Sequence, residues 1–175
     1  PLNVIDEIFD LYDEVAATTG FTPTAEQRGY AIRVSVADTD EKAYEEGRHF
    51  FWQLGTSFGI VPRHWQAPPG YMSREAAHGR REQARVGSVN ITPGGPIASY
   101  EEAHATYQIV SGNPDTVIKK LQRIIDAVDP GYMIFWGREG LMSHEVAMHG
   151  IDLMTQEVIP AIKAYRADRA RGRER

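Results

Sequence analysis

Two histidines and a glutamate in the C-terminal part of the chain have residue types that suggest metal chemistry. His144, Glu145 and His149 resemble the zinc-protease motif, whose two histidines lie four residues apart on one helix face. Here the histidines are five residues apart, which separates them by about 140° around a helix. We therefore expect no metal site. The chain also contains neither of the glycine-rich motifs that hold the phosphates of nucleotides.

Composition narrows the possible functions further. The chain has 175 residues, no cysteine and a formal net charge of −5. Without cysteine there is no disulfide, thiolate nucleophile or thiolate metal ligand, which fits a cytoplasmic protein. The acidic balance argues against a nucleic-acid partner, and no apolar run is long enough to span a membrane. The basic tail, residues 166–175, is either a solvated helix end or a phosphate-binding segment.

The first third of the chain has the pattern of a helix, a strand and a second helix. Apolar residues at helical spacing predict a helix over 3–19 that stops at Gly20. An alternating, β-branched run predicts a strand over 30–37. Asp38 and Glu41 resemble a capping box, so a helix is predicted to start there and to run to about residue 54.

The last third repeats this alternation. Asn113, followed by proline, is a good N-cap for a helix with one strongly apolar face. Residues 132–136 are continuously apolar, as expected of a strand buried on both faces of a parallel sheet. Ser143 can cap the last helix, and Pro160 lies near the expected end of that helix and should kink or interrupt it.

Residues 55–107 separate these two regions. They are rich in glycine and proline and, apart from a short polar helix around 73–84, show no sustained period, so we expect an irregular insertion or lid. The pattern leaves only two convincing strands. Two parallel strands cannot make a stable sheet with helices on its outside. We therefore expect an α/β fold that is incomplete on its own, with other segments or a partner supplying the remaining strands.

Three stretches carry a family resemblance. They are residues 34–43 (VSVADTDEKA), residues 109–117 (IVSGNPDTV) and residues 131–160, which hold a strand and the closing helix. In this order they resemble motifs of the bacterial-luciferase-like, flavin-dependent monooxygenases. The resemblance implies the C-terminal part of a (β/α)8 TIM barrel, with 30–37 and 132–136 as about strands 7 and 8. Residues 1–175 would then form a single partial barrel domain.

The same resemblance implies an activity and a cofactor. Members of this family bind reduced flavin mononucleotide (FMN), react it with O2 and oxygenate a small organic substrate. The implied partners are a flavin reductase that supplies the reduced flavin, and either a second copy of the chain in a homodimer or the missing N-terminal portion. Two alternatives remain open: an F420-dependent oxidoreductase of the same fold, and a non-catalytic partner subunit. The family's flavin-phosphate residues lie mostly on earlier strands, so no catalytic residue is assigned here.

The resemblance also indicates where ligand-binding residues should lie. In such a barrel they follow the C-terminal ends of the strands. Trp136 could flank the flavin or the substrate, or could fill the core; Gly137 and Arg138 follow it, and Arg138 could meet an anionic group or be solvated. In the expected lid, Tyr71 and Ser73 could donate hydrogen bonds to flavin or substrate. These five residues are the predicted cofactor-binding or substrate-binding positions.

Overall fold

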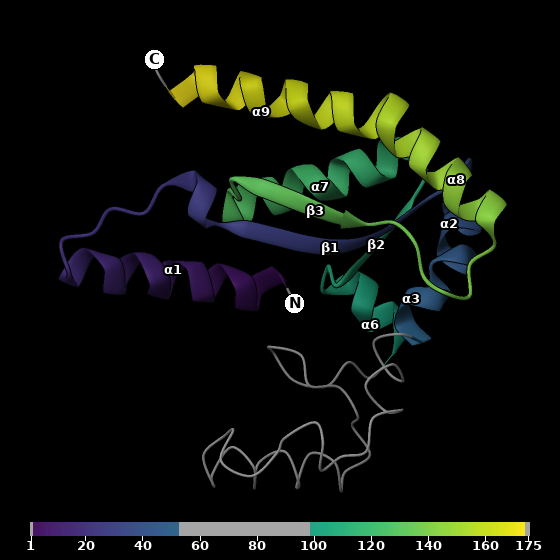
Figure 1. Cartoon of the computed structure of the whole chain (residues 1–175), viewed down its shortest axis with the longest axis horizontal. Helices are drawn as coiled ribbons and strands as arrows, with labels where there is room; N and C mark the ends of the chain where they lie inside the picture. Colours follow the sequence, from purple (N-terminus) through teal and green to yellow (C-terminus); the bar gives the residue numbers. More distant parts are fainter. Residues whose placement is uncertain (1, 53–98, 174–175) are drawn as a thin grey trace, which may run out of the picture.

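A computed structural model describes residues 2–52 and 99–173 of the chain (Figure 1). Tyr71 and Ser73, the predicted lid residues, lie outside the described residues, as does most of the 55–107 insertion. Within the described part of that insertion, Tyr100–Ala105 forms a short helix, α6, so this end of it is regular rather than irregular. No helix in the described ranges has both the length and the apolar character that crossing a membrane requires.

Three parallel strands form one sheet in the order β2-β1-β3. They are β1 (Gly29–Val36), β2 (Ile109–Gly112) and β3 (Tyr132–Trp136). The predicted parallel sheet and both predicted strands are confirmed. The expectation of only two strands was wrong, because β2 has just four residues and ends in glycine, which is too short for a strand period to show.

Helices precede, connect and follow the strands. Their bounds are α1 (Leu2–Thr18), the 3₁₀ turn η1 (Ala25–Gln27), α2 (Asp40–Glu46), α3 (Arg48–Trp52), α7 (Pro114–Val128), α8 (His144–Leu153), the π-helical turn η3 (Met154–Val158) and α9 (Ile159–Arg173). The predicted caps of α7 and α8 are confirmed: the side chains of Asn113 and Ser143 each accept a hydrogen bond from a backbone N–H of the first turn.

The second predicted helix differs from expectation in two ways. Its cap is Thr39, whose hydroxyl accepts a hydrogen bond from the Lys42 N–H at 3.2 Å, and not Asp38. It also breaks at Gly47 into α2 and α3. A Cβ atom at Gly47 would lie 2.5 Å from the Ser111 hydroxyl and 2.6 Å from that of Tyr100. Close contact with β2 and α6 therefore requires glycine at this point, which local periodicity cannot report.

The closing helix is interrupted before Pro160, as predicted. Proline cannot donate to the helical ladder, and the five residues of η3 adopt π-helical geometry immediately before the helix resumes as α9. The helix does not end near Pro160, however, but continues to Arg173. Its basic end is anchored, because Arg169 donates to the Ile125 carbonyl at 2.6 Å and to the Asp126 carboxylate at 3.0 Å.

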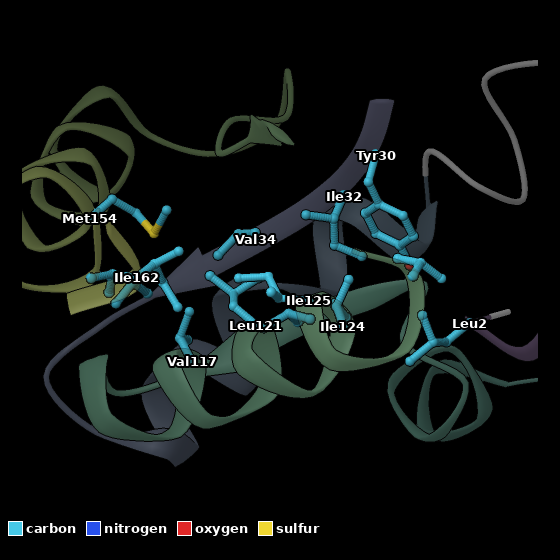
Figure 2. Packing of buried hydrophobic residues seen from close by; sticks show 14 residues of the cluster. Leu2, Tyr30, Ile32, Val34, Val117, Leu121, Ile124, Ile125, Met154 and Ile162 are labelled. Carbon is cyan, nitrogen blue, oxygen red and sulfur yellow. The ribbon is translucent and has the colours of Figure 1, made fainter. Parts of the chain in front are cut away.

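One face of the sheet is covered by helices. Even-numbered residues of β1, such as Ile32 and Val34, are 2–3% exposed and pack against the apolar stripe of α7, which includes Leu121 and Ile125 (Figure 2). Figure 1 shows α7 and α9 along this side of the sheet. Burying one such side chain stabilises the fold by about 1.5–3 kcal/mol. We call this side the helix face.

The opposite side, which we call the open face, is only partly covered. Over β2 it is closed by a second cluster that includes Phe50, Tyr100 and Ile109. Over β3 no element of the described ranges covers it: Tyr132, Ile134 and Trp136 are 51%, 57% and 49% exposed. The prediction that β3 is buried on both faces was therefore wrong. Its five apolar residues do not alternate with polar ones, so the pattern could not distinguish a covered face from an uncovered one.

Candidate ligand site at the carboxyl ends of β1 and β3

The pairing of β1 with β3 brings together residues that are a hundred positions apart in the chain. Cα partners along the two strands include Ala31 with Ile134 and Arg33 with Trp136. Side chains of paired residues in neighbouring parallel strands lie on the same face, so Arg33 and Trp136 share the open face. Ligands of parallel α/β sheets bind outside the carboxyl ends of the strands, and this is the end at which β3 stops.

Trp136 is fixed by two neighbours. Its indole Nε1 donates a hydrogen bond to the Arg138 carbonyl at 2.6 Å. The Arg33 guanidinium carbon lies 5.6 Å from the centre of a Trp136 ring, within cation–π range. The ring remains half exposed on the open face. Trp136 is therefore a held, half-exposed aromatic surface in the described structure, and its role beside a ligand stays a prediction.

A buried carboxylate stands next to this pair. Glu139 is only 8% exposed, and its Oε2 accepts a hydrogen bond from the Leu141 N–H at 3.2 Å. Burial lowers the pKa of the Arg33 guanidinium, and the charge of Glu139 acts against that lowering. Glu139 therefore helps to keep Arg33 charged on a partly desolvated surface.

A small cavity adjoins this cluster at the end of β1. Its volume is about 20 Å³, and Ser35, Gly137, Met142 and Gly150 are among the residues that line it. That is room for about one water molecule. The Ser35 side chain is 3% exposed, and its hydroxyl has no hydrogen-bond partner among the described residues. A buried hydroxyl without a protein partner beside such a space is suited to bind water or a polar ligand atom.

Two aspartates, Asp38 and Asp40, link the helices around this edge of the sheet through ion pairs and hydrogen bonds. The Asp38 carboxylate accepts hydrogen bonds from Lys42 at 3.1 Å and meets the His149 Nε2 at 2.8 Å, which links α2 to α8. The hydrogen bond from Lys42, and after it the one with His149, lowers the pKa of Asp38. Asp40 in turn accepts from the Asn113 N–H at 2.7 Å and from the Thr116 hydroxyl at 3.0 Å, which joins α2 to the start of α7.

The predicted site residues divide into three groups. Trp136 and Gly137 lie in the cluster just described, Arg138 is exposed beside it, and Tyr71 and Ser73 lie outside the described residues. Sequence reasoning missed Arg33, Ser35 and Glu139. For the first two a signal existed: in β1 the even positions are apolar, so the odd positions carrying Arg33 and Ser35 had to share the other face. Nothing local pointed to Glu139.

A second cavity lies at the other end of the sheet. It has a volume of about 550 Å³ and is lined by residues of α1, of α7 and of the segment before β2, including Asn3, Tyr107, Arg123 and Asp126. Tyr107 has a positive φ of 58°, and the Arg123 guanidinium lies 6.0 Å from its ring centre. In parallel α/β folds the amino ends of the strands serve stability, so this groove is not the site that we develop below.

No family model and no curated protein matches the chain. Solved structures do match its fold. The monooxygenase RslO1 from Streptomyces bottropensis is 18% identical, with a TM-score of 0.56 over 91% of this chain and 38% of that one. The oxygenating constituent of the Pseudomonas putida 3,6-diketocamphane monooxygenase, a type II Baeyer-Villiger enzyme in complex with FMN, is 20% identical, with a TM-score of 0.56 over 91% of this chain and 40% of that one.

These matches define the class of fold. The chain has an α/β fold, with a small parallel sheet, that is shared with part of two monooxygenases, one of which has FMN bound. It spans about two fifths of the length of these two proteins. The resemblance found in the sequence is thus confirmed for the fold.

Proposed function

We propose that this chain forms the C-terminal part of a (β/α)8 barrel of the bacterial-luciferase-like kind, in a monooxygenase that uses reduced FMN and O2 on a small organic substrate. The observation that carries the proposal is the shared fold over 91% of the chain with an enzyme whose structure holds FMN. That protein is described as the oxygenating constituent of its monooxygenase. We therefore propose a separate flavin reductase as the partner that supplies reduced flavin.

The one-sided sheet supports the barrel part of the proposal. In a (β/α)8 barrel the helices cover the outside, and the inner faces of all eight strands pack against one another. The helix face of this sheet has such an outer layer, whereas Ile134 and Trp136 on the open face are about half exposed. Large apolar side chains on a contiguous exposed surface indicate a contact that completes the fold. Further strands, or a second copy of the chain, would supply that contact.

The strand order sets a requirement on the complete barrel. In a barrel with its strands in chain order, β2 would lie between β1 and β3. In this structure β1 is the central strand, and β3 pairs with its other edge. The proposal therefore requires β3 to lie next to β2 when the barrel is complete, and the edge of β1 that β3 now occupies to pair with a preceding strand. This requirement can be tested directly.

The residues at the carboxyl end of the sheet fit a flavin or its substrate. Reduced flavin, when bound, supplies the electrons that activate O2. Trp136 offers a fixed, half-exposed aromatic surface for a planar ring, and Gly137, which has no side chain, follows it at the strand end within van der Waals range of the Val34 carbonyl. The buried Ser35 hydroxyl, without a partner among the described residues, can bind a polar ligand atom. Closing the open face would exclude water from the reaction.

Flavin binding tests this proposal. The natural full-length polypeptide is titrated with FMN, and with reduced FMN under anaerobic conditions, and the change in flavin fluorescence or absorbance is followed. We expect saturable binding of FMN, weakened in Trp136→Leu and unchanged in the exposed control Phe21→Leu. Binding of F420 without binding of FMN would replace the monooxygenase with an F420-dependent oxidoreductase. Binding of neither cofactor would favour a non-catalytic partial barrel.

A further inference from the structure

We propose that one side of α1 is the docking surface for the helix that precedes it in the outer layer of the complete barrel. The surface consists of Ile8, Leu11, Tyr12 and Val15, which we call the α1 stripe. The inference rests on the proposed function, because only a complete barrel supplies a preceding helix. The pairing of β1 with β3 plays no part in it, so the strand order that the barrel requires leaves it unaffected.

The α1 stripe is a row of large apolar side chains that remain exposed. Its four members follow one another at helical spacing, i, i+3, i+4 and i+7, and are 38–58% exposed. Single exposed apolar residues are common on protein surfaces, whereas a contiguous group on one side of a helix indicates a contact surface. The stripe is therefore a place where another segment packs.

A different side of α1 contacts the rest of the chain. Ile5 and Phe9 pack against the main apolar cluster, and Asp6 lines the cavity that α1 shares with α7 and with the segment before β2. The Leu2 N–H donates to the carbonyl of Thr106 in that segment at 2.9 Å. With 3.6 residues per turn, Asp6 lies about 170° around the helix from the centre of the α1 stripe. The stripe therefore points away from the segment that leads into β2.

This direction identifies the occupant. Helices form the outer ring of a (β/α)8 barrel, so each of them has a neighbour on either side. One edge of β1 pairs with β2, and the preceding unit of a barrel in chain order lies on the other side of β1. Since the α1 stripe points away from the β2 side, it faces the position of the preceding helix. Figure 1 shows α1 at the margin of the described structure.

The charge of α1 argues against a second copy of the same helix as the occupant. The helix contains five acidic residues and no lysine or arginine. Glu7, Asp10 and Glu14 are exposed and follow the border of the stripe that lies away from Ile5 and Phe9. Two copies of α1 packed stripe to stripe would bring like charges together. We therefore expect an occupant with apolar residues toward the stripe and lysine or arginine opposite this acidic row.

Thiol labelling of the natural full-length polypeptide tests the surface, because residues 1–175 contain no cysteine. The single variants are Leu11→Cys and Val15→Cys on the stripe, Glu14→Cys beside it and Ile134→Cys on the open face. Mass spectrometry follows the alkylation of the peptide that holds each thiol, at several protein concentrations. Glu14→Cys is the matched control, since Glu14 is exposed and adjoins Val15. Val15→Cys is the smaller change and remains informative if Leu11→Cys fails to fold.

We expect the thiols at positions 11 and 15 to react at least about 10-fold more slowly than the thiol at position 14, at every concentration, because a buried thiol reacts only after local opening. The thiol at position 134 should also be slow, since it lies inside the proposed barrel. Equal rates at positions 11, 14 and 15, with a slow thiol at 134, would overturn the docking surface and leave the barrel standing. A fast thiol at 134 would contradict the barrel, and the docking surface would fall with it.

A photo-cross-linking amino acid at position 11 of the same polypeptide identifies the occupant. The cross-linked peptide should come from the same molecule, from the part that precedes this chain, and should carry lysine or arginine. A cross-link to another copy of α1 would overturn the inference, as would slow labelling of positions 11 and 15 at high protein concentration only. Either result would assign the α1 stripe to an interface between two copies.

Discussion

The helix face and the open face of the sheet are built from alternate residues of the same strand, yet they differ in every physical respect. On the helix face, Ile32 and Val34 are 2–3% exposed and lie in a continuous apolar cluster with α7. On the open face, the same strand presents Ala31, Arg33 and Ser35, and its neighbour β3 adds half-exposed aromatic and aliphatic side chains. Consecutive residues of β1 therefore alternate between the buried core of the helix face and the candidate site on the open face.

The difference shows how the strand divides its tasks. Large aliphatic side chains at even positions stabilise the fold by leaving water, and any ligand there would have to displace packed helices. Small and polar residues at odd positions contribute little to such packing but leave space and hydrogen-bonding groups next to Trp136. Because successive side chains point to opposite faces, neither set of residues can take over the role of the other without a shift in register.

The largest expected effect distinguishes the two faces by stability. Ile32→Ala removes a buried side chain from the helix face and should lower the free energy of unfolding by about 2–5 kcal/mol. Ile134→Ala makes the same chemical change on the neighbouring strand, where the side chain is 57% exposed, and should cost about 1 kcal/mol or less. Urea denaturation of the 175-residue chain, followed by circular dichroism, measures both.

Equal losses in the two variants would mean that the open face is covered in solution. The comparison also bears on the proposed barrel. In a polypeptide that forms the complete barrel, Ile134 would lie inside it, and the cost of Ile134→Ala should rise toward that of Ile32→Ala. A cost that stays small in such a polypeptide would contradict the barrel.

Features that depend on residues close together in the chain could be predicted from the sequence, and features that depend on distant segments could not. The helix over Pro114–Val128 has its cap and its apolar stripe within a few residues, and both were predicted correctly. The uncovered side of β3 could not be predicted, because an unbroken apolar run does not say how many of its faces find a partner. The cluster of Arg33 with Trp136 and Glu139 arises only when β1 pairs with β3, so no spacing along the chain reveals it.

A second prediction tests the strand pairing that creates the candidate site. Ala31 and Ile134 are Cα partners on the open face, and neighbouring strands lie within the range that a disulfide can bridge. The chain has no cysteine of its own, so in the double variant Ala31→Cys, Ile134→Cys no other thiol competes for the disulfide. In the 175-residue chain we expect the disulfide to form under mild oxidation and to raise the free energy of unfolding by about 2–4 kcal/mol.

The control places one cysteine on the other face. Ala31→Cys with Phe135→Cys should stay reduced, because Phe135 packs on the helix face. Mass spectrometry after alkylation counts the free thiols in each protein. Failure of the first pair to form in the 175-residue chain would contradict the β1–β3 register. In a complete barrel with its strands in chain order, the same pair should remain reduced, since β3 would then lie beside β2.

The smallest expected effect concerns the covered end of the open face, over β2. The ring of His104 on α6 contacts Tyr44 at a tilt and Tyr100 edge-on, with ring centres 4.9 and 4.5 Å apart. Burial, with a smaller contribution from Lys120, lowers the pKa of His104 to about 4. An unfolded histidine titrates near 6.5. Between these values the unfolded chain binds a proton that the folded chain does not, so stability falls as the pH is lowered through that window.

His104→Phe keeps a ring in this cluster and removes the titration. The urea midpoint of this variant should therefore depend less on pH than that of the wild type between about pH 6.5 and 5.5, where carboxylates with ordinary pKa values near 4 stay ionised. His144→Phe, on an exposed position of α8, is the matched control and should keep the wild-type slope. Equal slopes in all three proteins would mean that His104 is open to water, and that the aromatic cover over β2 is as incomplete as the bare face over β3.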